Sequence, residues 1–179
     1  MITAELKHKI EIAIKLIEAA SQKAALVNQP LEICYSGGKD SDVILQLARM
    51  SNANIRVIYK NTTIDPPGTI SHVKENQVEI VRPEMTFKQI IEKKGIPSRK
   101  FRFCCARLKE YKILDYAVMG IRREESEKRK NRYKEPEICR VYRNNNKCRV
   151  YLPILQLTNE DVANFITEYK IKCHPLYYD

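Results

Sequence analysis

One short segment has the composition of a phosphate-binding loop: Ser36, Gly37, Gly38, Lys39, Asp40 and Ser41. Gly37 and Gly38 have no Cβ, so the backbone can turn tightly and direct successive N–H groups at one anion. Two serine hydroxyls add donors, and the ammonium of Lys39 adds positive charge. The pattern is not a Walker A loop, because an aspartate separates the lysine from the second serine and the glycine spacing differs. The segment therefore predicts a phosphate site of another class.

A second group of candidate anion-binding residues follows a predicted strand at 117–121: Arg122, Arg123, Ser126 and Arg129. Guanidinium groups bind phosphate or sulfate through paired hydrogen bonds. The carboxyl ends of parallel strands meet at one edge of a sheet, so we expect these residues to face the Ser36–Ser41 loop. For the remaining charges at 128–134 we favour a solvated surface.

Two adjacent cysteines, Cys104 and Cys105, form the third chemical feature. Three basic side chains flank them: Arg102, Arg107 and Lys109. Nearby cations lower the pKa of a thiol and favour the thiolate, which ligates metals and attacks electrophiles. Cys139 and Cys148 follow, but none of the spacings is CxxC, which argues against a compact zinc site built from neighbouring residues. Buried or idle thiols are the alternative, and for Cys139 we give the two interpretations equal weight.

The elements that must position these residues alternate between strand and helix. Hydrophobic periodicity and breakers predict helices at 3–27, from 43, from 69, at 86–94 and at 159–169, and strands at 31–35, 55–59, 78–81 and 117–121. This alternation is typical of βαβ units. We therefore predict an α/β fold with a doubly wound, mainly parallel sheet that has helices on both faces.

Composition limits the remaining options. A chain of 179 residues with 44% hydrophobic and 30% charged residues fits one domain over 1–179 and excludes disordered and fibrous classes. No run approaches eighteen apolar residues, so we expect no membrane association and a soluble, cytoplasmic protein with reduced thiols. The formal net charge of +10 favours a polyanionic partner: a nucleotide, an iron–sulfur protein or nucleic acid.

Four ordered motifs resemble the phosphoadenosine phosphosulfate (PAPS) reductase family of PP-loop proteins. They are the SGGKDS string at 36–41, the CC-x-x-LK segment at 104–109, the G-I-R-x-x-E-S-x-x-R segment at 120–129, and the closing PI…DV…PLY pattern at 153–177. The resemblance spans most of the chain. It implies the adenine nucleotide α-hydrolase-like fold.

The resemblance also implies roles for individual residues. Ser36–Ser41 would hold the nucleotide phosphates, and the phosphosulfate or its equivalent would contact Arg122, Arg123, Ser126, Arg129 and Lys109. The adenine and ribose would lie near Tyr35, Asn61 and Thr62. This chain has Asn61-Thr62-Thr63 where the family often has Asp-Thr-Gly, so a role that rests on that aspartate is not carried over.

Two family features lie outside the 179 residues. PAPS reductases use a cysteine in a C-terminal ECGLH-type tail, and many relatives continue past Pro175-Leu176-Tyr177 into a cysteine pair that completes a metal or iron–sulfur site. We therefore expect a chain truncated at its C-terminus, a metal site that is lost, or a site made by Cys104, Cys105, Cys139 and Cys148 alone. With these cysteines we expect weak binding of zinc or an iron–sulfur cluster, or none.

Three functions remain open. The first is an oxidoreductase or transferase of sulfur metabolism that binds PAPS or adenosine phosphosulfate for thiol-dependent reduction, with a thioredoxin-like reductant. The second is an ATP-cleaving sulfurtransferase that acts on nucleic acid, to which the basic region 99–149 would be suited. The third is a nucleotide-binding module without catalysis. The sequence also leaves a homodimer open, and it does not identify the catalytic residue.

Overall fold

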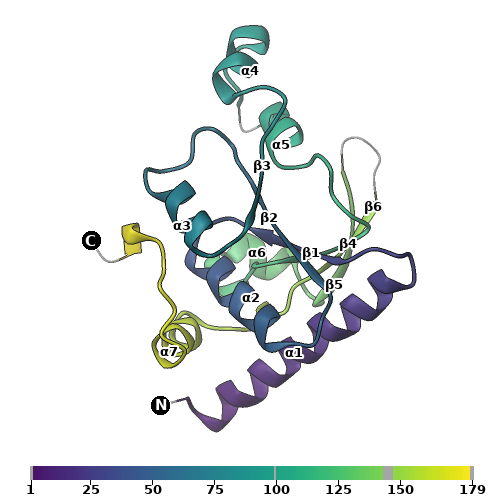
Figure 1. The fold of residues 1–179 in the computed structure, drawn as a ribbon, viewed down its shortest axis with the longest axis vertical. Helices are drawn as coiled ribbons and strands as arrows, with labels where there is room; N and C mark the ends of the chain where they lie inside the picture. The colour runs from purple at the N-terminus through teal and green to yellow at the C-terminus, as the bar shows by residue number, and fades with distance from the viewer. Residues whose placement is uncertain (1, 99, 143–146, 178–179) are drawn as a thin grey trace.

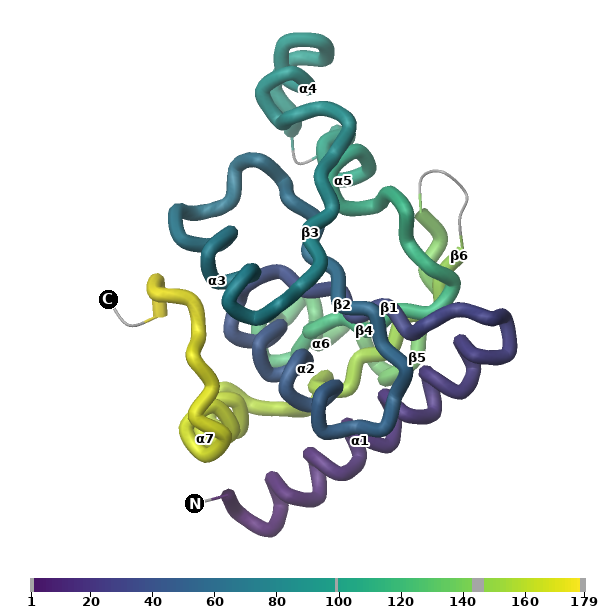
Figure 2. Tube along the Cα trace, in the orientation of Figure 1, coloured from purple at the N-terminus to yellow at the C-terminus, as the bar shows by residue number. Residues whose placement is uncertain are grey.

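The computed structural model describes residues 2–98, 100–142 and 147–177, which build one mixed sheet flanked by helices (Figures 1 and 2). Its strands are β1 (Leu31–Tyr35), β2 (Ile55–Lys60), β3 (Glu79–Val81), β4 (Tyr116–Met119), β5 (Glu137–Val141) and β6 (Lys147–Tyr151). Its α-helices are α1 (Ala4–Ala25), α2 (Lys39–Met50), α3 (Thr69–Glu75), α4 (Phe87–Lys94), α5 (Phe103–Leu108), α6 (Glu127–Arg132) and α7 (Asn159–Glu168). Two short 3₁₀ turns, Arg123–Glu125 and Pro175–Tyr177, complete the described elements.

The strands lie in the order β3-β2-β1-β4-β6-β5. All neighbours are parallel except β5, which runs antiparallel to β6 at the edge. The order reverses at β1, because β2 follows on one side and β4 on the other. The carboxyl ends of β1 and β4 therefore form the switch point at which open α/β sheets bind ligands. This topology confirms the predicted doubly wound, mainly parallel sheet.

One face of the sheet, here named the front face, is covered by α1, α2 and α3 (Figure 1). Alternate residues of β1, Leu31 and Ile33, point to it and have no exposed surface. They pack with apolar positions of α1 at helical spacing, such as Ala13 and Ile17. Removing this apolar surface from water is the main source of the fold's stability.

The opposite, rear face carries the intervening residues of the same strands, Glu32 and Cys34 of β1 and Ile58 and Lys60 of β2. Two short helices of the described residues lie here: α6 sits behind the sheet in Figure 1, and α5 lines a cavity on this side. A smaller apolar cluster centred on Val150 fills the part under β4, β5 and β6. The two faces thus differ in helix length and in polarity.

Most predicted elements are present within a few residues of their predicted bounds. Thr86 and Thr158 cap α4 and α7 with reciprocal side-chain bonds to residues three positions on, as expected for helix starts. The prediction placed the cysteine pair before a helix, whereas both cysteines lie within α5. It also missed the β5–β6 hairpin, whose strands pair antiparallel beside an otherwise parallel sheet.

The helices α4 and α5 project away from the rest of the molecule (Figures 1 and 2). Ile96 and Phe101, which lie between them, are 84% and 73% exposed. None of the described helices is long and apolar enough to cross a membrane.

Candidate nucleotide-binding site

The Ser36–Ser41 loop joins the end of β1 to the start of α2. Gly37 has a φ of +79°, a conformation that glycine adopts without strain, and a Cβ there would lie 3.1 Å from Cγ2 of Thr69. Gly38 is the N-cap of α2 and gives no side-chain cap, so the first N–H groups of the helix are open to an anion. Ser41 Oγ donates to the carbonyl of Gly38 at 2.7 Å and fixes the turn.

The loop after β4 packs directly against this one. A Cβ at Gly120 would lie 3.2 Å from the carbonyl oxygen of Asp40, so only glycine allows so close a backbone approach. Arg122 Nε donates to Asp40 Oδ1 at 2.9 Å. The two predicted anion-binding segments therefore do meet at the carboxyl edge of the sheet.

Arg122 nevertheless does not present its charge to a ligand. It is 2% exposed, and besides Asp40 its guanidinium bonds to the carbonyl of Leu157 at 3.4 Å and to Asn159 Oδ1 at 3.0 Å. These partners saturate most of its donors. In this structure Arg122 instead holds Asp40 and with it the loop, and its direct contact with a phosphate or sulfate stays a prediction.

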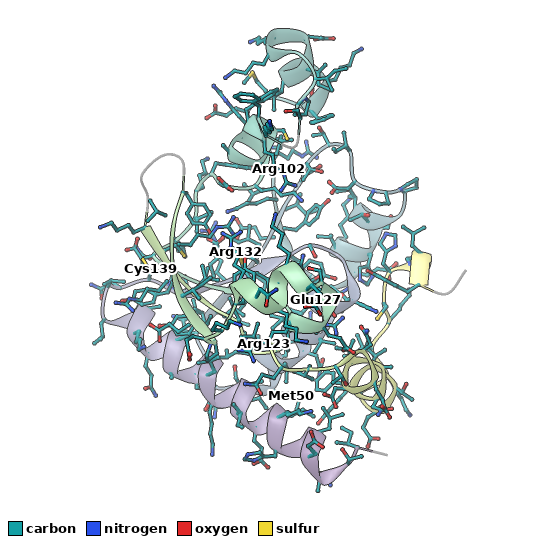
Figure 3. All side chains as sticks on the ribbon, turned by 180° about the vertical axis from the view of Figure 1, so that it is seen from behind. Met50, Arg102, Arg123, Glu127, Arg132 and Cys139 are labelled. Atoms are coloured by element: carbon teal, nitrogen blue, oxygen red, sulfur yellow. The ribbon has the colours of Figure 1, made fainter. Side chains whose placement is uncertain are left out.

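Arg123, Ser126 and Arg129 are also engaged elsewhere. Arg123 donates to the backbone carbonyls of Tyr133 and Lys134, Ser126 caps α6, and Arg129 pairs with Glu125. Arg123 and Ser126 line a separate surface cavity beside α6, and Arg123 lies well away from Arg102 in Figure 3. Their predicted role in anion binding stays a prediction.

A cavity of about 420 Å³ opens from the loop across the rear face. It is lined by Glu32, Cys34, Tyr35, Ser36, Ile58, Tyr59, Lys60, Thr62, Asp65, Arg102, Cys105, Lys109, Glu110, Ile113, Met119, Arg140 and Tyr142. Its volume lies in the range of small-molecule and cofactor sites. Of the predicted residues, the cavity brings together Ser36, Tyr35, Thr62, Lys109 and Cys105.

Two ion pairs form much of the polar surface of the cavity. Glu32 is fully buried and accepts from Lys60 Nζ at 3.3 Å and from the Leu114 N–H at 3.1 Å. Arg140 pairs with Glu110 at 3.3 Å. These four residues were not predicted from the sequence. A signal was present for Glu32, because it lies between Leu31 and Ile33 in a strand that the βαβ pattern predicts to be covered on both faces. A charged residue in such a strand needs a partner.

Arg102 and Lys109 also line the cavity, and neither makes an ion pair with a carboxylate of the described residues. Both residues are exposed, and a cation that lacks a carboxylate partner is available to an anionic ligand. The anion-binding role of Lys109 stays a prediction that this position allows. Arg102 lines the same cavity, although its sequence position marked it only as a neighbour of the thiols.

The thiol of Cys105 faces this cavity, whereas Cys104 is not part of the lining. Burial and then the neighbouring Cys104 raise the pKa of the Cys105 thiol, and they outweigh the opposing effects of Arg102 and Lys109. The expectation that the basic neighbours lower this pKa was wrong, because desolvation is the larger effect. Burial also raises the pKa of Cys34 far above its ordinary value, so both thiols in the cavity are protonated at neutral pH.

Of the residues expected near the adenine, Thr62 lines the cavity and Asn61 does not. Thr62 lines the cavity, and its N–H donates to Asp65 Oδ2 at 2.9 Å. Asn61 Oδ1 accepts from the Thr63 N–H at 2.7 Å and shapes the turn without lining the cavity. Asp65 therefore brings a carboxylate to the cavity at the place where the chain lacks the family's Asp-Thr-Gly aspartate.

The predicted four-cysteine metal site is not assembled. Cys139 is exposed on β5, while Cys148 is buried on β6 and burial raises its pKa to about 12. Within residues 2–98, 100–142 and 147–177, no three His, Cys, Asp or Glu side chains are grouped as metal ligands. Cys104 and Cys105 thus have no further ligands in the described chain, and this donor set does not fit a tetrahedral metal or a cluster.

Comparison with known proteins adds to this geometry. Residues 30–179 match the family model of the phosphoadenosine phosphosulfate reductase domain. A curated relative, an uncharacterized protein of Methanocaldococcus jannaschii, is 31% identical over 134 residues, which cover 67% of this chain and 31% of the relative. This chain therefore matches less than a third of that protein's length.

A solved structure of the same family supports the fold. A phosphoadenylyl-sulfate (PAPS) reductase from Candida auris, solved as a phosphate complex, aligns with a TM-score of 0.58 at 17% identity, over 99% of this chain and 92% of that one. An NMN synthetase from Francisella tularensis aligns with a TM-score of 0.49 at 12% identity, over 92% and 71% of the two chains. The family match extends from the start of β1 through the PP-loop to the last residue, and the chain therefore belongs to the phosphoadenosine phosphosulfate reductase domain family.

Proposed function

We propose that this chain binds an adenine nucleotide with its phosphates on Ser36–Ser41 and its adenosine moiety in the 420 Å³ cavity. The observation that carries the proposal is the continuity of the two features: Ser36 belongs to the loop and also lines the cavity. Uncapped N–H groups at the start of α2 suit a phosphate, and Thr62 and Asp65 offer polar partners for a ribose or an adenine.

We further propose that the nucleotide is PAPS or adenosine phosphosulfate and that the chain acts in sulfur reduction in the cytoplasm. Cys105 is the proposed nucleophile, because it faces the cavity with Arg102 and Lys109. Its thiol, which is protonated in the free protein, gives its proton to solvent, and the sulfur attacks the sulfonate sulfur to form a Cys–S–sulfonate. The S–O bond to the phosphate breaks, and its electron pair leaves with the phosphate oxygen of the released nucleotide. A thioredoxin-type dithiol then reduces the resulting Cys–S–sulfonate to thiol and sulfite and becomes a disulfide.

Calorimetric titration with PAPS, adenosine phosphosulfate and ATP–Mg²⁺ tests the nucleotide. Binding of a phosphosulfate in preference to ATP is the expected result. Sulfite release in the presence of a thioredoxin-type dithiol tests the chemistry, with Cys105→Ser as the inactive variant and Cys139→Ser as the matched control on an exposed thiol. Preferential binding of ATP, or full activity of Cys105→Ser, would refute this assignment.

A second candidate, ATP-dependent sulfur transfer to nucleic acid, is favoured by one specific observation. Positions 88–112 carry nine Lys or Arg and two Glu, and of these cations none that the structure describes pairs with a carboxylate. Elsewhere many are paired, as at Lys9, Arg56 and Arg149. The unpaired charges lie on the projecting α4–α5 segment beside exposed Phe101, a combination typical of nucleic-acid contacts. Residues 99 and 143–146 of the basic region lie outside the described residues.

Salt-dependent binding of a single-stranded RNA or DNA tests this second candidate. Replacing Lys93, Lys94 and Lys100 by Gln should reduce affinity about tenfold or more and flatten its dependence on salt. The control replaces Lys9, Arg56 and Arg149, which are paired with carboxylates. If both variants lost nucleic-acid affinity equally, sulfur reduction would be the better proposal. The same would hold if the protein released no pyrophosphate from ATP in the presence of nucleic acid.

A further inference from the structure

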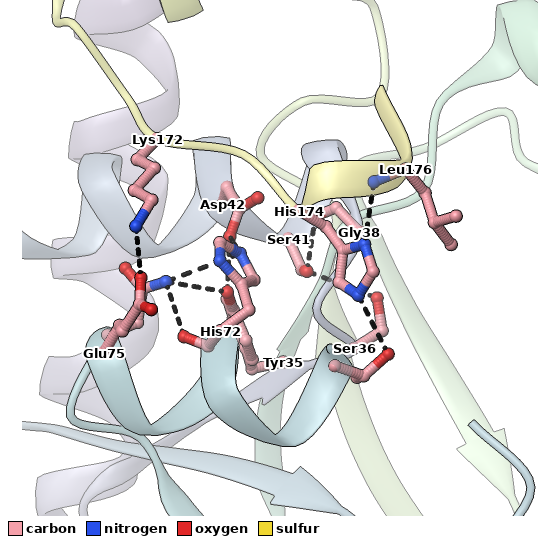
Figure 4. A network of polar contacts seen from close by, with 12 residues as sticks. Tyr35, Ser36, Gly38, Ser41, Asp42, His72, Glu75, Lys172, His174 and Leu176 are labelled. Carbon is pink, nitrogen blue, oxygen red and sulfur yellow. Dashed lines mark hydrogen bonds and ion pairs between the residues drawn. The ribbon is translucent and has the colours of Figure 1, made fainter. Parts of the chain in front are cut away.

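The segment 172–177, next to the C-terminus, crosses the PP-loop from the side of α3 and α7 (Figure 4). Its anchor is His174, which is 3% exposed. His174 Nδ1 accepts the Leu176 N–H at 3.2 Å, so the ring proton is on Nε2, which donates to Thr69 Oγ1 at 3.1 Å. Thr69 starts α3 and is the residue whose methyl group a Cβ at Gly37 would meet.

The same anchor orients Tyr177. The Tyr177 N–H donates to the carbonyl of His174 at 3.0 Å, which closes the turn between them. A Cβ at Gly38 would lie 3.2 Å from the Tyr177 hydroxyl oxygen, so the phenol reaches the backbone of the loop itself. Lys39 Nζ lies 5.9 Å from the centre of the Tyr177 ring, within cation–π range. The phenol hydroxyl is thus placed beside the uncapped start of α2.

We propose that Tyr177 is a phosphate-binding residue of the nucleotide site and that His174 positions it. This inference rests on the proposed binding of a nucleotide to Ser36–Ser41. The phenol O–H is a donor, and Tyr177 and Lys39 line a different cavity from the one proposed to take the adenosine. An anion on the α2 N–H groups would accept from the loop on one side and from Tyr177 on the other.

The placement also accounts for the second glycine of the loop. Gly38 has φ −90° and ψ 161°, which any residue can adopt, so its backbone does not require glycine. A side chain at this position would meet the Tyr177 hydroxyl at 3.2 Å. A Cβ at position 38 would therefore fit only if the Tyr177 phenol, which lies far away in the sequence, shifted by a few tenths of an ångström.

Tyr177→Phe is the decisive variant, because it removes only the hydroxyl and keeps the ring over Lys39. Calorimetry should give roughly tenfold weaker binding of ATP, adenosine phosphosulfate and inorganic pyrophosphate, with unchanged binding of adenosine. His174→Gln should weaken the same three ligands, and the double variant should lose no more than the larger single effect. Leu176→Ala, 56% exposed in the same segment, is the control and should bind like the wild type.

Two outcomes separate this inference from the proposed function. If the wild type binds a phosphosulfate or ATP and Tyr177→Phe binds it equally or more tightly, the hydroxyl is no ligand or obstructs the site, and only this inference fails. If the wild type binds none of these nucleotides, the proposed function fails and the inference with it. Equal loss of adenosine and phosphorylated ligands would indicate a general structural effect and would also overturn the inference.

Discussion

The front and rear faces of the sheet use the same strands for different purposes. On β1, Ile33 points forward into an apolar core under long helices, while its neighbour Glu32 points backward to a charged partner beside a cavity. Burial of apolar side chains stabilises the fold without requiring a specific partner, whereas each buried charge needs its own partner. The difference indicates that stability comes mainly from the front face, while the rear face carries the buried ion pair and the cavity.

Truncating one isoleucine on each face tests that comparison most strongly. Ile33→Ala should lower the free energy of unfolding by about 4 kcal/mol, because it leaves a void in a closed core. Ile58→Ala should cost only about 2 kcal/mol, because Ile58 borders the existing cavity and water can fill the space. Urea unfolding of both variants measures the difference. Equal losses would show that the rear face is packed as tightly as the front.

Removing the buried carboxylate should be nearly as damaging as the front-face truncation. Glu32→Ala leaves Lys60 and the Leu114 N–H without their acceptor and should cost about 3 kcal/mol. Adding Lys60→Met to Glu32→Leu should recover part of that loss, since no unpaired charge remains. The same urea experiment applies. A single Glu32→Ala variant as stable as the wild type would mean that water already solvates this pair.

A smaller effect is expected where α7 meets α1. Burial raises the pKa of the Asp161 carboxyl, but hydrogen bonds from Thr158 and Lys9 outweigh it and hold the pKa below its ordinary value. The carboxylate therefore stabilises the fold at neutral pH, and this contribution is lost as the pH falls below about 4 toward the lowered pKa. Asp161→Asn should cost about 1 kcal/mol at pH 7 and almost nothing near pH 2. Urea midpoints of the wild type and Asp161→Asn measure this difference from pH 7 to pH 2. If the difference did not shrink as the pH fell, the assignment would be wrong.

The smallest expected effect concerns thiol reactivity on the rear face. Because burial raises the pKa of Cys105, less thiolate is present at pH 7.5, and alkylation by iodoacetamide should be several-fold slower than at exposed Cys139. Chains that retain one of the two thiols, with the other cysteines replaced by serine, make the comparison direct. The alkylation rate at Cys105 should keep rising to a higher pH than the alkylation rate at Cys139. Faster alkylation at Cys105 than at Cys139 would instead support an activated thiolate.

Local patterns were sufficient for much of the fold. The bounds of β1 and the starts of α3 and α7 were predicted from breakers, caps and periodicity, which depend on neighbouring residues. The β5–β6 hairpin was missed, because its antiparallel pairing at the sheet edge has no signal in the βαβ alternation. In the candidate site, the loop at 36–41 and Lys109 were predicted, whereas Glu32, Lys60 and Arg140 were not.

The sequence by itself determined the glycine-containing turn at 36–41, the alternation of strands and helices and the family motifs, because glycine, capping residues and hydrophobic period act over a few residues. Only the tertiary structure decided that Arg122 pairs with Asp40, that desolvation raises the pKa of Cys105, and that the Tyr177 hydroxyl lies beside Gly38. Each of these depends on which distant group removes water or supplies a partner. Burial and pairing are properties of the packed chain, and spacing along the sequence does not specify them.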